Sequence, residues 1–331
     1  MPINLSAIEY GTIYHSTPWH QVLIEGFNVQ VSHLVTEIDG KVVALTPIFL
    51  KRRYGMSLCG SPLKGLFTEY AGPRFDFQLE VSDRAAIFDN QMSLLRSMRY
   101  PYIEIGLKSE ATINSDFIFS SMHKHGFIYY PRPSLVVDLT KGPEYLWMSF
   151  ESRARNMIRK AEKNQVIVKV EALEINLLEE YVAMIKATFN RQSLAMPHSF
   201  SAYAALVRNL EPIGCLFFVS ARHQGRLVSA GIFLITDTNR MVFHSGSSSS
   251  EGMTLAASSL VQWKAMQEAY KRGIEEYDLG GVGVSSIDRF KKSFGGAPVS
   301  HHRWVFSSTI IKRGSRLVYW LASKGLLRVF K

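Results

Sequence analysis

The chain has 331 residues, enough for two domains of ordinary size, and 47% of them are hydrophobic while 20% are charged. This composition is typical of a folded globular protein and excludes long disordered or collagen-like segments. Cys59 and Cys215 lie far apart and have no Cys/His spacing of a zinc site. No apolar run approaches the length that spans a bilayer, and the N-terminus lacks the pattern of a signal peptide. We therefore expect a cytoplasmic protein that uses no metal.

The net charge of +10 arises at the C-terminal end of the chain. After Asp288 there are ten Lys or Arg residues and no Asp or Glu, whereas the first 288 residues are neutral. A one-sided basic end predicts a surface for a polyanion: a phosphate-bearing substrate, a nucleic acid or an anionic membrane. A solvated cationic end with no partner is the alternative.

Two segments of the chain show the same order of expected elements. Strand, tight turn and strand are expected over residues 34–50 and again over residues 217–235. Each hairpin is followed by an amphipathic helix and by a short strand that ends in an acidic residue and glycine. These elements are expected at residues 83–98 and 102–106, and at residues 254–271 and 277–281. A further helix and strand complete each segment, so the pattern predicts an α/β fold with two mixed sheets.

The boundary between the segments is expected where turn residues, Thr140 to Pro143, precede a helix start at Glu144. We therefore predict domains at residues 1–140 and 141–309, followed by a basic amphipathic tail at residues 310–331. The tail mixes aliphatic and aromatic residues with six cations and no acid, which is typical of a helix on anionic lipid. Packing of the tail on the protein itself is the alternative.

A basic helix is expected near residues 152–163. Arg155 and Arg159 are four residues apart and therefore share a face of this helix. Guanidinium groups bind phosphate oxygens in a bidentate manner, so these two residues are candidates for contact with a phosphate-bearing substrate. A solvated basic face is the alternative.

Glycines and cations gather after the strand at residues 277–281. Asp278 lies within this strand, and Lys291 and Lys292 follow on a short helix. A lysine at a strand end can stabilise the oxyanion of an acyl-transfer intermediate, whereas a helix cap and a core turn are the alternative. Arg289 and Lys292 are candidate substrate-binding residues beside it.

His244 precedes a serine-rich segment, residues 245–250, that is expected to be a binding loop or a flexible loop. A histidine between a strand end and a helix start is a candidate general base, and an ordinary hydrogen-bonded histidine is the alternative. The sequence contains no G-x-S-x-G, Walker A, H-E-x-x-H or dinucleotide-binding glycine motif. Hydrolase, phosphoryl-transfer, zinc-protease and dehydrogenase activities are therefore disfavoured.

Three segments together resemble the Fem-type aminoacyltransferases and their GNAT-like acetyltransferase relatives: S-R-A-R-N-M-I-R-K-A-E-K-N, Y-D-L-G-G and R-F-K-K-S-F-G-G. The resemblance implies tandem GNAT-like domains, each a mixed β-sheet flanked by helices. It also implies an acyltransferase that forms an amide on an amino group of a cell-envelope precursor, such as one of peptidoglycan, or of a polysaccharide sugar.

The resemblance also implies roles for individual residues. Arg155 and Arg159 match substrate-phosphate contacts, and Lys291 matches the cation near the carbonyl under attack. Asp278 and its first-half counterpart Glu104 match carboxylates near the site. The implied partners are an anionic acceptor and, as open alternatives, tRNA and the inner face of the membrane.

The resemblance leaves the acyl donor open between acyl-CoA and aminoacyl-tRNA. Around Thr254 the chain contains S-S-E-G-M-T-L-A, which departs from the pyrophosphate loop of simple acetyltransferases. The long coiled-coil arm of larger Fem enzymes is also not expected here. Two alternatives therefore remain: an acyl-CoA-dependent N-acetyltransferase of a small amine, and a non-catalytic binder of anionic lipid or nucleic acid.

Overall fold

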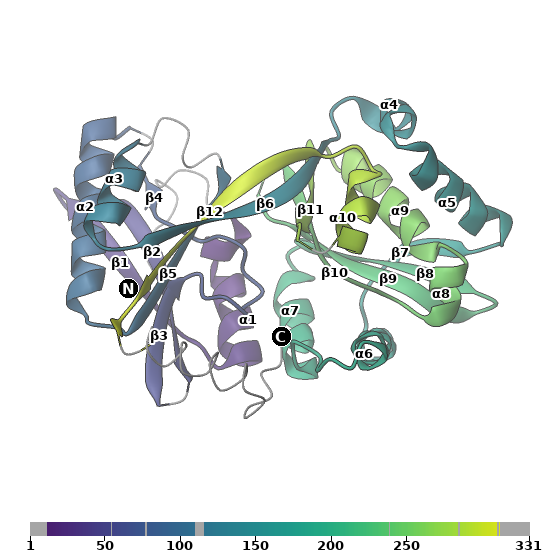
Figure 1. Cartoon of the computed structure of the whole chain (residues 1–331), viewed down its shortest axis with the longest axis horizontal. Helices are drawn as coiled ribbons and strands as arrows, with labels where there is room; N and C mark the ends of the chain where they lie inside the picture. Colours follow the sequence, from purple (N-terminus) through teal and green to yellow (C-terminus); the bar gives the residue numbers. More distant parts are fainter. Residues whose placement is uncertain are drawn as a thin grey trace. The chain divides into compact units, whose positions relative to one another are not determined.

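The computed structural model describes residues 12–53, 55–76, 78–109, 116–237, 239–283 and 285–309, together with residue 311. The chain divides into two compact units (Figure 1). Unit 1 comprises Met1–His15, Asn28–Pro131 and Ser300–Lys331, and unit 2 comprises Ser16–Phe27 and Arg132–Val299. The basic tail predicted at residues 310–331 lies outside the described residues except for Ile311.

Unit 1 contains a mixed sheet with the strand order β1-β2-β3-β5-β12. Its strands are β1 (Gln30–Ile38), β2 (Lys41–Arg53), β3 (Met56–Ser61), β5 (Tyr102–Leu107) and β12 (Ala297–Ser307), and the short β4 (Arg74–Phe75) pairs with β2. Neighbouring strands are antiparallel except for β3 and β5, which are parallel. The helices α2 (Val81–Ser97) and α3 (Asp116–Lys124) contribute Phe88, Met92 and Met122 to the core of this unit.

Unit 2 contains the remaining strands of the 12-stranded mixed sheet, in the order β6-β11-β10-β9-β8-β7. Its strands are β6 (Ile128–Asp138), β7 (Ile167–Glu171), β8 (Leu216–His223), β9 (Arg226–Ile235), β10 (Arg240–Ser248) and β11 (Glu276–Gly281). Here β10 and β11 form the parallel pair, and their other neighbours are antiparallel to them.

Helices cover both faces of the unit 2 sheet (Figure 1). The helices α4 (Gly142–Ser149), α5 (Ser152–Lys163) and α9 (Ala257–Lys271) share one core with Phe217 of β8. The next residue, Phe218, points to the opposite face and contacts Tyr181 of α6 (Ile175–Arg191), because side chains alternate along a strand. The helices α1 (Thr17–Phe27) and α7 (Phe200–Leu210) pack together, and α8 (Ser250–Thr254) and α10 (Ser285–Lys292) are short.

The predicted α/β fold, with mixed β-sheet flanked by helices, is confirmed, although the strands belong to one 12-stranded sheet and not to two separate sheets. The helix expected at residues 254–271 is present as α9, which begins at Ala257 because Ala256 adopts a left-handed conformation with φ of 59°. One local expectation is wrong. The expected loop at residues 245–250 instead continues β10 as far as Ser248, paired with β9.

The compact units divide within β6, between Pro131 and Arg132, and within β12, between Val299 and Ser300. The later part of β6, from Ser134 to Asp138, pairs with β11 in unit 2. The later part of β12, from His302 to Ser307, pairs with β5 in unit 1. The boundaries at residues 140 and 309 stay a prediction about the repeat in the sequence.

In the described part of the chain, no helix combines the length and apolar character that crossing a membrane requires.

Candidate active site

The two parallel strands of unit 2 part before either of them ends. In the described part of the chain, β10 and β11 pair from Arg240 to Val242 and from Glu276 to Asp278. Beyond this point β10 remains paired with β9, and a register shift between Phe243 and Ser245 marks a bulge. A ligand can approach the backbone where neighbouring strands of an α/β sheet separate. This point is therefore the candidate active site.

Lys291 of α10 reaches the point where the strands part. Its side chain is buried, with the residue 8% exposed, and its Nζ donates a hydrogen bond to the carbonyl oxygen of Gly281 at 2.7 Å. Gly280 has φ of +79°, and a Cβ at Gly280 would lie 3.5 Å from both Lys291 Nζ and the carbonyl oxygen of Phe243. The three elements β10, β11 and α10 thus converge on a glycine. A buried ammonium there can stabilise negative charge that develops on a substrate oxygen.

The helix α10 is anchored by two aromatic side chains. The rings of Phe290 and Phe294 lie 5.2 Å apart in edge contact, and Phe294 packs on Phe150 at 5.3 Å. This anchoring turns Lys291 inward and leaves Lys292 exposed, because adjacent helical residues point about 100° apart. Arg289 and Lys292 are both exposed, so both cations are accessible to an anionic substrate.

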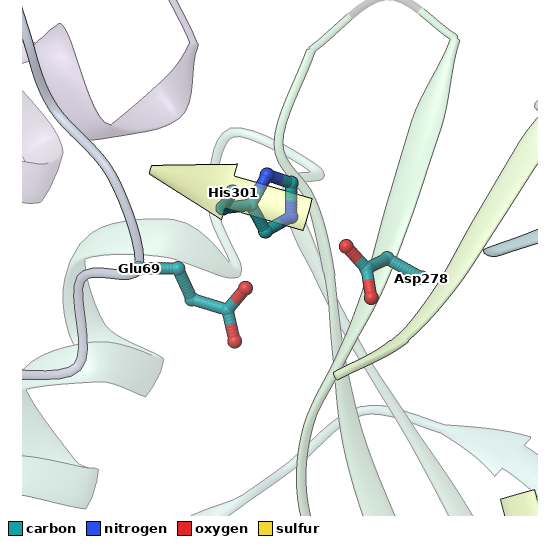
Figure 2. A group of neighbouring side chains, drawn as sticks. All are labelled: Glu69, Asp278 and His301. Carbon is teal, nitrogen blue, oxygen red and sulfur yellow. The ribbon is translucent and has the colours of Figure 1, made fainter. Parts of the chain in front are cut away.

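Asp278 is buried on β11 and shapes the same turn (Figure 2). Its Oδ1 accepts hydrogen bonds from the backbone N–H of Gly280, at 2.8 Å, and from Ser134 Oγ. The carboxylate therefore holds the left-handed turn at Gly280 that Lys291 contacts. The other side chains labelled in Figure 2, Glu69 and His301, belong to unit 1.

His244 occupies the bulge in β10, with its Nε2 atom buried. Burial, and next the proximity of His198, lowers the pKa of His244 to about 3. The imidazole is therefore neutral at physiological pH and is a weak base there. Such a group is better suited to hydrogen bonding than to proton abstraction.

The sequence analysis missed a hydrogen-bonded cluster next to this bulge. The hydroxyl of Tyr181 lies 2.8 Å from Ser245 Oγ, and Tyr203 also hydrogen-bonds Ser245. Burial raises the pKa of Tyr181 and of Tyr203, so both phenols stay protonated as neutral donors. The serine-rich segment indicated Ser245 as a candidate. In the sequence, however, Tyr181 and Tyr203 cannot be distinguished from core residues of amphipathic helices.

Arg155 and Arg159 share a face of α5, as expected, but have different surroundings. Arg155 Nη1 donates to the backbone carbonyls of Met148, at 3.2 Å, and Phe150, so it caps the end of α4. Arg159 is exposed, with its guanidinium 5.3 Å from the ring centre of Trp147. The helix α5 packs on α9, whereas Lys291 lies on α10.

Glu104 lies buried in unit 1, where its carboxylate has several partners. Arg303 Nε lies 2.5 Å from Oε1, and Oε2 accepts from the Tyr102 hydroxyl and the backbone N–H of Lys64, both at 2.9 Å. Burial, reinforced by the Glu104 charge, raises the pKa of Tyr102 to about 12. This network binds β5 to β12 within unit 1.

The segment after β10 forms the short helix α8, which begins with a capping serine. Ser249 Oγ accepts the backbone N–H of Gly252 at 3.0 Å, and a Cβ on Gly252 would lie 1.9 Å from the carbonyl oxygen of Val228. Glu251, in the first turn, lies 2.6 Å from His223 Nδ1. Arg226 Nη2 lies 3.1 Å from the same carboxylate and compensates its charge.

Residues 148–292 match the family of acetyltransferase (GNAT) domains. No curated protein matches the chain. Among solved structures, FemX is 14% identical with a TM-score of 0.67, over 89% of this chain and 93% of FemX. The C-terminal domain of a protein described as a lysylphosphatidylglycerol synthetase from Agrobacterium fabrum is 11% identical with a TM-score of 0.57, over 93% of each chain.

A tandem GNAT protein from the clavulanic acid biosynthesis pathway is 10% identical with a TM-score of 0.55, over 90% of this chain and 98% of that protein. Identities this low show a shared fold alone. The matched range contains β10, β11 and α10, the elements that converge on Gly280. We conclude that the chain is an acyltransferase with a GNAT acetyltransferase domain at residues 148–292 and with the fold of FemX and tandem GNAT proteins.

Proposed function

We propose that the chain transfers an acyl or aminoacyl group to an amino group of a cell-envelope precursor or a polysaccharide sugar. The observation that supports this proposal best is the buried Lys291 ammonium at the point where β10 and β11 part. When an amine attacks the donor carbonyl, negative charge develops on the carbonyl oxygen. Lys291 stabilises that charge while the C–N bond forms. The attacking nitrogen then passes a proton, through water, to the departing oxygen or sulfur of the donor, and the acyl C–O or C–S bond breaks as the amide forms.

The surrounding groups have supporting roles in this proposal. Asp278 positions Gly280 and thereby the contact between β11 and Lys291. His244 and the phenol of Tyr181 remain neutral, so they orient substrates by hydrogen bonds and do not add charge. The exposed Arg159, Arg289 and Lys292 bind the phosphate of an anionic acceptor.

We propose aminoacyl-tRNA as the preferred donor. At the start of α8, Ser249 already accepts the backbone N–H of Gly252, which does not favour a pyrophosphate at the segment after β10. Acyl-CoA is the second candidate, because the matched family consists of acetyltransferase domains. Calorimetry with coenzyme A distinguishes the two: we expect no binding heat, and saturable binding would favour acyl-CoA.

The acceptor class is proposed from the resemblance to the Fem-type aminoacyltransferases, and the name of one fold neighbour, a lysylphosphatidylglycerol synthetase, is consistent with an acceptor of the cell envelope. The test supplies radiolabelled aminoacyl-tRNA or acyl-CoA together with a nucleotide-linked amino-sugar peptide, an amino polysaccharide or a small amine. We expect a labelled amide on one of the first two acceptors. Product from acyl-CoA and the small amine alone would establish the second enzymatic alternative. A binder without catalysis would give no product with any pair.

A further inference from the structure

The helix α4 exposes apolar side chains to an unusual extent. It buries Leu146, but Met148 is 75% exposed and Tyr145 is 52% exposed. The two residues are three apart and so lie on the same side of the helix. Met148 has the largest exposed fraction of the large hydrophobic residues in the described part of the chain. Exposed apolar side chains that lie together on one side of a helix can contribute to an interaction surface.

One cation lies beside these apolar side chains, and others lie on the neighbouring residues of α4 and α5. Lys141 Nζ lies 4.7 Å from the ring centre of Tyr145, and the Arg159 guanidinium lies over Trp147. Lys160 and Lys163 of α5 are also exposed. Residues 141–163 contain six Lys or Arg residues and three Glu residues. Aromatic rings, a protruding methionine and an excess of cations thus occupy two consecutive helices, which we call the α4–α5 surface.

We propose that the α4–α5 surface docks on an anionic lipid bilayer. Tyr145 and Met148 enter the interfacial region, while Lys160 and Lys163 contact lipid phosphates. Aromatic and aliphatic side chains bordered by cations are suited to the boundary between headgroups and acyl chains. Single-stranded nucleic acid would also attract the cations, but it favours flat rings that stack and gains little from a flexible thioether. The exposed Met148 therefore favours lipid.

The proposal is independent of the proposed function, because vesicle binding needs neither donor nor acceptor. The full chain is sedimented with phosphatidylcholine vesicles that contain about 30% phosphatidylglycerol, and with pure phosphatidylcholine vesicles as a reference. The double substitution Tyr145→Ser and Met148→Ser should weaken binding to the anionic vesicles by about tenfold or more. The matched control is Met253→Ser, which removes a methionine of α8 that is 56% exposed, and it should bind like the unchanged protein.

Charge is tested separately with the pair Lys160→Gln and Lys163→Gln. Each substitution should weaken binding about fivefold at low salt, and about 0.5 M salt should abolish the difference. Thermal melts of every variant check that these exposed substitutions leave the fold intact.

Three results would overturn the proposal. The first is unchanged vesicle binding by the Tyr145/Met148 variant. The second is binding that disappears when residues 312–331 are deleted but persists in that variant, which would assign docking to the tail. The third is competition by bulk tRNA that depends on Lys160 and Lys163 but not on Met148, which would make the surface a nucleic-acid site.

Discussion

Each unit contains one pair of parallel strands, and the two pairs end differently. In unit 1, β3 and β5 pair over four residues, and the backbone amides of Ala71 and Gly72 then both donate to the carbonyl of Gly106. A Cβ on Gly106 would lie 2.9 Å from the ring of Pro62. In unit 2, β10 and β11 pair over three residues, and a lysine ammonium lies where they part. The end of the parallel pair is therefore closed by backbone hydrogen bonds in unit 1, whereas a lysine side chain lies at the end of the parallel pair in unit 2.

Each parallel pair also has an acidic residue on its second strand, Glu104 on β5 and Asp278 on β11, and these two residues have different partners. Glu104 forms an ion pair with Arg303 and accepts a hydrogen bond from Tyr102, so its carboxylate stabilises unit 1. Asp278 instead shapes the glycine turn that Lys291 contacts. We infer that duplication supplied two scaffolds, of which unit 1 serves stability and unit 2 serves chemistry.

The largest expected effect comes from removing the carboxylate of unit 1. Glu104→Ala leaves the largely buried Arg303 without its ion-pair partner, so we expect a loss of about 3–5 kcal/mol in the free energy of unfolding. Denaturant unfolding measures this loss, and Glu104→Gln should lose less because it keeps hydrogen bonding. Turnover per folded molecule should stay near that of the unchanged protein. A stable Glu104→Ala protein with lost turnover would break the comparison.

Gly280→Ala should affect both stability and activity. Its φ of +79° strains any side chain by about 1–2 kcal/mol, and the new methyl group would contact Lys291 Nζ. The matched control is Gly225→Ala in the β8–β9 turn, where φ is +80° and nothing lies within 4 Å of the added Cβ. Equal destabilisation of both variants, with kcat/KM lowered only in Gly280→Ala, would sharpen the assignment of the site. Equal kcat/KM in the two would contradict it.

The free energy of unfolding should depend on pH through His244 of unit 2. Its folded-state pKa of about 3 lies below the ordinary value of 6.5, so the unfolded chain binds more protons between these values. The stability contribution is therefore complete above pH 6.5 and is lost as the pH falls toward 3, at up to about 1.4 kcal/mol per pH unit. Unfolding measured across this window should show a smaller slope in His244→Gln. A break in kcat/KM near pH 6.5 that disappears in this variant would instead make His244 a general base.

The two arginines of α5 should give the smallest effects and should differ from each other. Arg155→Ala removes donors from the end of α4 and should lower stability by about 1–2 kcal/mol. Arg159→Ala removes an exposed cation, so it should raise the acceptor KM a few-fold and leave kcat and stability nearly unchanged. Steady-state kinetics and thermal melts on both variants test this split. Lowered kcat with unchanged KM in Arg159→Ala would be inconsistent with a binding role.

Local features of the fold could be predicted from the sequence because they depend on short-range chemistry. The turns at Asp39–Gly40 and Gln224–Gly225 have the positive φ angles that tight hairpins need. Phe290 and Phe294, four residues apart, indicated which side of α10 faces the core, and Lys291 is buried there while Lys292 is exposed.

Features that depend on distant contacts could not be predicted. The later part of β6 pairs with β11 and the later part of β12 pairs with β5, and a repeat pattern carries no information on such long-range pairing. The spacing of Arg155 and Arg159 gave their shared face but not the carbonyls that occupy Arg155. Likewise, no local pattern shows that Tyr181 meets Ser245 across 64 residues of sequence.

The central claim is that chemistry depends on the ammonium of unit 2 and not on the carboxylate of unit 1. The most direct measurement is kcat of Lys291→Met, Lys292→Met and Glu104→Gln with the same donor and acceptor. We expect kcat and kcat/KM of Lys291→Met to fall together by about 10²–10³, with the other two near normal. Normal turnover in Lys291→Met, or an equal loss in Glu104→Gln, would contradict the account.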